Sequence, residues 1–319
     1  MSSLSDTLEK LQDTHAMMTR VSKDLARDPD DYALNLTLRS LQAREKKLAR
    51  EFHELAHADF QDVCTYRLVD EAKRRFPIAA VADVLKEFQG LVTLVFDALR
   101  TGPKKQARYS IEAEALSTFH FGYASPGSLA VVMTVPNERM LVDKSDLDKA
   151  VETVFAIAKC ETPTALRDYA QRVGIGPIRK TFAWVERHTV HQLSVDVQWK
   201  RREEERGALL MQTADFERLK AIIEATSDYA EEVIDVDAAN LVGLDIDRKT
   251  FHLKYGEAED ISGKWADRAS IAESLAVPGF YSVRLLKRTR IFYSYDQETV
   301  TYELLSLAPG VQKETAQPA

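Results

Sequence analysis

The most strand-like stretch of this 319-residue chain spans residues 116–135, and it sets what the surrounding sequence must provide. In its first half, aromatic residues alternate with small or polar neighbours: Phe119, Phe121 and Tyr123. Residues 129–135 then form a nearly continuous apolar run, and the intervening Pro126 and Gly127 suit a tight connection. The pattern predicts a β-hairpin in which one strand is half-buried and its partner is buried on both faces.

Amphipathic helices on both sides of this hairpin are expected to cover it. Their apolar stripes lie in residues 78–99, 145–158, 163–173 and 177–191. Two more alternating segments, residues 62–69 and 193–199, predict additional strands. We therefore predict an α+β protein whose central domain, residues 59–228, is a mixed or antiparallel sheet layered with helices.

Residues 1–58 carry two helical stripes joined by a short turn that contains Pro29. Apolar side chains recur every three or four positions, except at His15 and Glu45. This spacing predicts an antiparallel helical hairpin of coiled-coil type. Because two helices cannot bury both stripes alone, the hairpin packs either on the body of the chain or on another copy. The residues predicted for self-association are Leu4, Leu8, Leu11, Leu38 and Leu41.

From about residue 229 the sequence changes to short β segments at close spacing, with one predicted helical insert at residues 268–276. Many short strands within about 80 residues are typical of a small barrel of the SH3-like or OB-like kind. We place this barrel in residues 229–308, and residues 309–319 are expected to form a disordered tail.

Composition narrows the class of protein. The net charge of −7 disfavours a general nucleic-acid coat protein, because phosphate binding relies on Lys and Arg. The acidic, helical N-terminus lacks the pattern of a signal peptide, and no apolar run is long enough to span a membrane. Cys64 and Cys160 lie in apolar contexts far apart, which predicts buried free thiols and a cytoplasmic location.

One short motif has the pattern of a zinc site. His53-Glu54-Leu-Ala-His57 matches H-E-x-x-H, in which two histidines one helical turn apart bind Zn²⁺ and the glutamate acts as general base. The match covers five residues, and the third ligand would be Asp70 or Glu71. We keep zinc as an alternative to no cofactor. His188 and His191 are also three apart, but their place at a helix C-terminus explains them without a metal.

Basic and aromatic residues interleave near the end of the predicted barrel, in what we interpret as two adjacent strands. Small barrels bind single-stranded nucleic acid with such side chains, since aromatic rings stack on bases and cations follow phosphates. The candidate binding residues are Arg284, Lys287, Arg288, Arg290, Tyr293 and Tyr295. The alternative is that these aromatic residues belong to the core and the cations to a solvated turn.

The chain lacks the phosphate-loop, dinucleotide-binding and kinase signatures. We therefore predict a non-catalytic cytoplasmic interaction or sensor protein that self-associates or recruits a partner through its helical hairpin. By analogy of layout, adaptor subunits of bacterial multi-gene systems, including phage defence, combine such parts. The two alternatives are single-stranded nucleic-acid binding by the barrel and a zinc metallopeptidase built on His53, Glu54 and His57.

Overall fold

The computed structural model describes residues 3–69, 76–125, 129–137, 144–202, 204–255, 259–271 and 275–309. The chain divides into two compact units, Met1–Thr226 and Ser227–Ala319. The first unit mixes helices with an open sheet, and the second contains a closed β-barrel, so the predicted α+β class is confirmed. Within the described ranges, no helix has both the length and the apolar character needed to cross a membrane.

The sheet of the first unit has the strand order β2-β3-β1-β4-β5, and each neighbouring pair is antiparallel. The strands are β1 (Gln61–Val69), β2 (His120–Ser125), β3 (Ala130–Pro136), β4 (Ser194–Arg201) and β5 (Glu204–Met211). The predicted hairpin is confirmed as β2 and β3, although its turn, residues 126–128, lies outside the described residues. β3 is buried on both faces from Ala130 to Val135, as its apolar run predicts.

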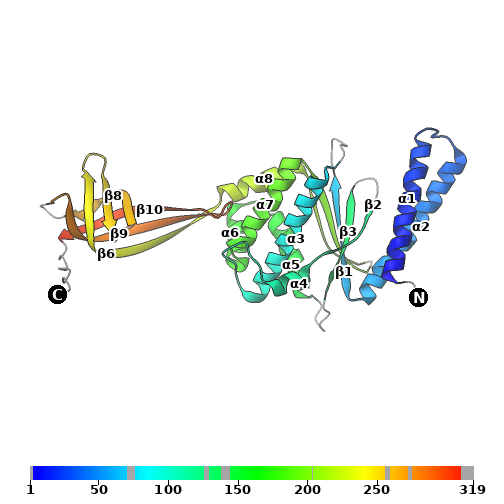
Figure 1. Ribbon diagram of the computed structural model, residues 1–319, viewed down its shortest axis with the longest axis horizontal. Coiled ribbons are helices and arrows are strands. Elements are labelled where there is room, and N and C mark those ends of the chain that lie inside the picture. The colour runs from blue at the N-terminus through cyan, green and yellow to red at the C-terminus, as the bar shows by residue number, and fades with distance from the viewer. Residues whose placement is uncertain are drawn as a thin grey trace, which may run out of the picture. The chain divides into compact units, whose positions relative to one another are not determined.

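Helices α3, α5 and α7 cover one face of this sheet (Figure 1). The helices that follow β1 are α3 (Ile78–Thr101), α4 (Ile111–Ser117), α5 (Asp146–Ala158), α6 (Pro163–Val173), α7 (Ile175–His191) and α8 (Thr213–Ala225). The strand-like stretch was predicted to begin at residue 116. This start is wrong, because residues 116 and 117 are the last two residues of α4. Ser110 caps this short helix by accepting a hydrogen bond from the Ala113 N–H, which favours a helical turn before the strand.

The aromatic residues of β2 do not share one face, because a β-bulge shifts the register between Phe121 and Tyr123. Phe119, which directly precedes β2, stacks on Phe88 of α3, whereas the ring of Tyr123 contacts Phe52 in the N-terminal hairpin. The extra residue is Gly122, where a Cβ atom would lie 2.9 Å from the Val132 carbonyl oxygen. Residues 119–123 thus supply aromatic rings to both layers.

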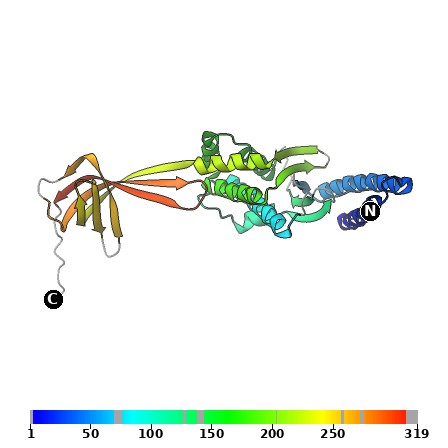
Figure 2. The ribbon, with the colours of Figure 1, turned by 90° about the horizontal axis from the view of Figure 1, so that it is seen from above.

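The N-terminal helices α1 (Leu4–Leu25) and α2 (Tyr32–Ala58) form a helical hairpin on the other face of the sheet (Figures 1 and 2). Leu11 and Phe52 are fully buried in a cluster that includes Val63 of β1 and Val132 of β3. The base of the hairpin therefore packs on the chain's own sheet. Where the leucine stripes are interrupted, His15 Nε2 lies 2.8 Å from Glu45 Oε1, so the two polar exceptions face each other.

The second unit is a closed barrel with the strand order β10-β8-β7-β6-β9. Its strands are β6 (Ser227–Asp245), β7 (Thr250–Tyr255), β8 (Glu259–Ile271), β9 (Gly279–Phe292) and β10 (Glu298–Pro309). β6, β9 and β10 also run together as a three-stranded ribbon (Figure 2). Pro309 ends β10, and the rest of the predicted tail lies outside the described residues.

Two predictions for the barrel are wrong. The insert at residues 268–276 is not helical at its start, because β8 continues to Ile271; residues 272–274 lie outside the described part of the chain. The strands are also fewer and longer than predicted. β6 joins two predicted segments through an irregularity between Val236 and Ala239, and β9 runs without a break through the basic stretch.

Candidate functional site

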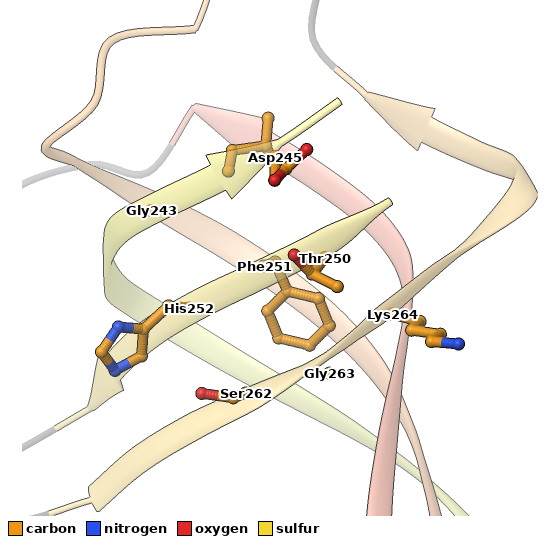
Figure 3. A pocket seen from close by; sticks show the side chains of 9 residues that line it. Gly243, Asp245, Thr250, Phe251, His252, Ser262, Gly263 and Lys264 are labelled. Carbon is orange, nitrogen blue, oxygen red and sulfur yellow. The ribbon is translucent and has the colours of Figure 1, made fainter. Parts of the chain in front are cut away.

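A groove of about 630 Å³ crosses β6, β7 and β8 of the barrel (Figure 3). Three consecutive residues from each strand line it: Gly243, Leu244 and Asp245 of β6, Thr250, Phe251 and His252 of β7, and Ser262, Gly263 and Lys264 of β8. Its volume falls within the range of about 300–1,000 Å³ that is usual for small-molecule sites.

Strand register arranges the outward-facing residues of the groove in two rows across the three strands. Gly243 pairs with His252, which pairs with Ser262. Asp245 pairs with Thr250, which pairs with Lys264. Since successive side chains of a strand point to opposite faces, both rows lie on one face and the intervening row lies on the other. The groove therefore combines an imidazole, an ammonium group, a carboxylate and two hydroxyl groups.

Glycine shapes the groove on both faces of the sheet. Gly243 leaves the space opposite His252 open, because a Cβ atom there would only reach ordinary contact, 3.7 Å from His252 Cβ. Gly263 belongs to the interior row beside Phe251, where a Cβ atom would lie 2.1 Å from the Tyr302 carbonyl oxygen of β10. Backbone and small side chains thus form the floor of the groove.

Charges of both signs surround the groove. His252 Nε2 lies 3.4 Å from Asp260 Oδ1, and Lys254 Nζ lies 3.9 Å from the same oxygen. The stretch from residue 227 to 309 contains nine Lys or Arg against fifteen Asp or Glu, a formal charge of −6. The barrel as a whole is therefore acidic, and any attraction for an anion must be local to cations such as Lys264.

The three arginines predicted to bind nucleic acid lie along β9, and two of them pair with carboxylates on the neighbouring strands. Arg284 Nε and Nη2 donate to the two carboxylate oxygens of Asp235 on β6, at 2.7 and 3.1 Å. Arg288 donates to Glu231 on β6 at 2.8 Å and to Glu303 on β10 at 2.5 Å. The hydrogen bonds from Arg284 hold the pKa of Asp235 below its ordinary value. These cations already neutralise charge within the ribbon.

The remaining candidates lie on β9 and in the bend that follows it, and their surroundings differ. Lys287 is half-buried on β9, facing Glu232 in the register of β6. Tyr293 is buried, and its hydroxyl donates to Asp228 at 2.7 Å. Arg290 stacks on the Phe292 ring at 4.6 Å, and Tyr295, which is half-exposed, lies 5.5 Å from that ring. The structure thus separates five of the six predicted residues between ion pairs, core and a small aromatic cluster, and Lys287 lies opposite Glu232 in the strand register.

The histidine motifs lie on helices, as predicted. His53 and His57 occupy the last two turns of α2, with the exposed Glu54 between them. Among the described residues, no cluster of three His, Cys, Asp or Glu side chains is suited to hold a metal ion, and Asp70 and Glu71 lie outside them. Zinc therefore stays a prediction. His188, in the last turn of α7, is fully buried and hydrogen-bonded to Tyr66 and Leu193.

The leucines predicted for self-association lie at both ends of the hairpin. Leu4 and Leu8 pack against the same cluster as the fully buried Leu11. Leu38 and Leu41 are half-buried in the part of α2 closer to the turn between the helices. Three of the five therefore contribute to packing within the chain.

Sequence reasoning missed the groove because its residue types are ordinary and only strand pairing brings them together. No family model matches this chain, and comparisons with curated proteins and with solved structures also find no match. The geometry of the groove consequently carries the functional inference.

Proposed function

We propose that this chain is a non-catalytic binding protein whose barrel groove holds the sugar–phosphate backbone of a single strand of nucleic acid. The observation that carries the proposal is the pair of rows on β6, β7 and β8. Lys264 and His252 supply donors for phosphate oxygens, while Thr250 and Ser262 supply hydroxyl groups for sugar and phosphate oxygens.

The connectivity of the barrel supports this use of β7 and β8. Numbered along the chain, its strands follow the order 1-2-3-5-4 and close back on strand 1, and strands 3 and 5 (β8 and β10) are parallel. We assign this arrangement to the OB-like kind. In OB-fold barrels, the face of strands 2 and 3 and the adjoining loops bind oligonucleotides and oligosaccharides.

The groove favours contacts to the backbone of the ligand over stacking on its bases. Phe251 is buried in the interior row, and the other ring in the lining is the imidazole of His252. Without an exposed Phe, Tyr or Trp ring in the lining, the bases lack the platform that usually gives single-strand binders much of their affinity. We therefore expect weak binding that is insensitive to base sequence and strongest at low salt, since the phosphate contacts compete with salt.

The test measures fluorescence anisotropy of a labelled 12-nucleotide oligothymidylate with the full chain at low salt. Lys264→Ala is expected to weaken binding several-fold, because one phosphate contact is lost, and to reduce the salt slope by roughly 0.7. Arg288→Ala is the matched control on the same barrel, and it should leave binding unchanged because this arginine is paired with Glu231 and Glu303.

The opposite ranking, with Arg288→Ala weakening binding and Lys264→Ala neutral, would move the site to β9. If the mononucleotide competes as well as the 12-mer at equal phosphate concentration, the ligand is a small sugar phosphate. If neither binds, the proposal fails.

Self-association through the hairpin is a second candidate function, supported by the exposure of its outer half. Tyr32 is 80% exposed and Leu36 is 56% exposed, beyond the part of the hairpin that packs on the sheet. Charge also differs along this half. Asp28, Asp30 and Asp31 gather at the turn, next to Arg27, and exposed cations follow along α2: Arg39, Arg44, Lys46 and Lys47.

We propose a second copy of this chain as the occupant of that surface. In a two-fold antiparallel arrangement, the acidic turn of one hairpin meets the basic segment of its partner, and the four helices form a bundle. Binding by the barrel and association through the hairpin together suit an adaptor subunit. The buried free thiols of Cys64 and Cys160 fit the reducing cytoplasm that we propose as its location.

Light scattering after gel filtration tests the association. The wild type is expected to form a dimer. The double variant Tyr32→Ser/Leu36→Glu should raise the dissociation constant of this dimer at least tenfold, so that the monomer predominates. Ile111→Glu is the control, because Ile111 is an equally exposed apolar residue on α4, outside the hairpin. A wild-type monomer, or a dimer that survives the double variant, would rule this interface out.

A further inference from the structure

A second cavity, of about 350 Å³, lies within the first unit where α3, α4, the end of β3 and the start of α5 meet. Its lining residues are Phe96, Arg100, Leu116, Pro136, Asn137, Lys144, Ser145, Asp146, Leu147 and Lys149. The cavity is independent of the barrel groove, and the proposed nucleic-acid binding does not use it.

The wall of the cavity combines apolar side chains, three cations and the carboxylate of Asp146. Phe96, Leu116 and Leu147 form an apolar part. Around it lie three cations, each paired with an acid: Arg100 with Glu112 at 3.1 Å, Lys144 with Glu152 at 2.6 Å and Lys149 with Asp146 at 2.9 Å. Because ion pairs at the surface contribute little stability, these cations can exchange their partners for a ligand at small cost.

Asn137 adds a fixed polar group to this wall. Its side chain is 3% exposed, its backbone N–H donates to the Phe60 carbonyl at 2.9 Å, and its amide nitrogen donates to Asp62. These two hydrogen bonds hold the Asn137 amide in one orientation at the cavity wall.

Asn137 is positioned by a buried ion network that it contacts through Asp62. Asp62 is 1% exposed and accepts two hydrogen bonds from Arg201, at 3.1 and 3.0 Å. Arg201 also donates to Asp148 at 2.8 Å, and Trp199 donates to the other oxygen of Asp148 at 3.1 Å. Burial opposes the ionisation of Asp148, but hydrogen bonds from the Ser145 backbone, Trp199 and Arg201 hold its pKa below the ordinary value.

This network joins β1, β4 and α5, and through Asp62 it also reaches a residue of the cavity wall. Apolar residues of similar size usually stabilise a core as well as a buried ion network does. What apolar residues could not do is fix the amide of Asn137 at the cavity wall through Asp62. The network therefore makes sense as support for a binding surface.

We propose that this cavity binds a small amphipathic anion, with its apolar part against Phe96 and Leu116 and its charge facing Lys149 and its neighbouring cations. A hydrogen-bonding group of the ligand meets the Asn137 amide.

The dye 8-anilinonaphthalene-1-sulfonate is a suitable probe, because it joins apolar rings to one anionic group. The full chain is expected to bind it with saturable fluorescence. Lys149→Glu, a change at a half-exposed lysine, should weaken binding about tenfold by reversing one charge at the rim. Lys159→Glu is the matched control, since Lys159 follows the same helix at its far end and does not line the cavity.

Two further measurements distinguish the outcomes. Leu116→Trp should abolish the saturable component by filling the cavity, with near-ultraviolet circular dichroism confirming the fold. Unlabelled naphthalene-1-sulfonate should displace the dye, whereas sulfate at equal ionic strength should not. If Lys149→Glu and Lys159→Glu bind alike, or if sulfate displaces the dye equally well, the proposal of an amphipathic ligand is overturned.

Discussion

At the scale of single residues, His188 shows how one buried side chain makes the fold depend on pH. Its Nδ1–H donates to the Leu193 carbonyl at 2.7 Å, and its Nε2 accepts the Tyr66 hydroxyl hydrogen at 2.6 Å. Trp184 donates to the same hydroxyl at 2.9 Å, and Phe216 stacks on the imidazole with ring centroids 4.2 Å apart. Every polar atom of this cluster is satisfied only while the imidazole is neutral.

We predict that this histidine makes the first unit less stable in acid. Burial lowers the pKa of His188 from 6.5 to about 4. The unfolded chain therefore binds more protons than the folded chain between these values, and stability falls as the pH drops through this window, by about 3 kcal/mol in total. His188→Asn is expected to be less stable at pH 7.5, with a gap to wild type that narrows by roughly 2–3 kcal/mol at pH 4.5.

Urea unfolding followed by tryptophan fluorescence at several pH values measures this gap. The exposed His120→Asn serves as the control and should show no pH-dependent difference from wild type. A constant gap for His188→Asn across the range would mean that another group carries the acid sensitivity.

Residue-scale prediction from sequence was limited by partners far apart in the chain. The interruptions of the two leucine stripes, His15 and Glu45, are visible in the sequence, and their pairing follows once the helices are antiparallel. By contrast, Tyr66 and His188 are 122 positions apart, and no local pattern connects them. The same holds for Asn137 and Asp62, whose contact depends on β1 pairing with β3.

At the scale of elements, the close approach of β8 and β10 depends on Gly263. A Cβ atom at this position would lie 2.1 Å from the Tyr302 carbonyl oxygen and 2.9 Å from the Phe251 ring. Gly263→Ala must therefore separate two hydrogen-bonded strands, and we predict a loss of about 2–3 kcal/mol in barrel stability.

Gly243→Ala is a matched comparison in the same groove. Its Cβ atom would meet only His252 Cβ, at an ordinary 3.7 Å, so the barrel should keep its stability. Thermal unfolding followed by the fluorescence of Trp265, which packs against the barrel core, separates the two variants. Equal stability of the two would show that β8 and β10 can move apart at little cost.

Helices and strands can be predicted from the sequence where the apolar pattern of a single segment determines its secondary structure. The long stripe of α3 and the alternation of β4 predicted both correctly. The prediction of a turn between two strands at the basic stretch of β9 is wrong, because the acids that pair with its cations, such as Glu231 and Glu303, lie on other strands and give no local signal. Acid partners on other strands, like the bulge at Gly122, become visible only after strand pairing is known.

At the scale of the whole molecule, the two units have separate cores and separate candidate sites. The barrel core is built from residues of 236–307, and the cavity beside Asn137 lies entirely within the first unit. Each ligand should then stabilise only the unit that holds its site, because a ligand stabilises the state that binds it by an amount set by its free concentration and dissociation constant.

Hydrogen exchange read by mass spectrometry can measure this for each peptide of the intact chain. At a hundredfold excess of oligothymidylate over its dissociation constant, peptides of β7 and β8 should gain about 2.7 kcal/mol in opening free energy while those of α3 and α7 stay unchanged. The naphthalene dye should give the reverse pattern. Protection that rises equally in both units with either ligand would mean that they open as a single cooperative body, and the two sites would then have to be treated as coupled.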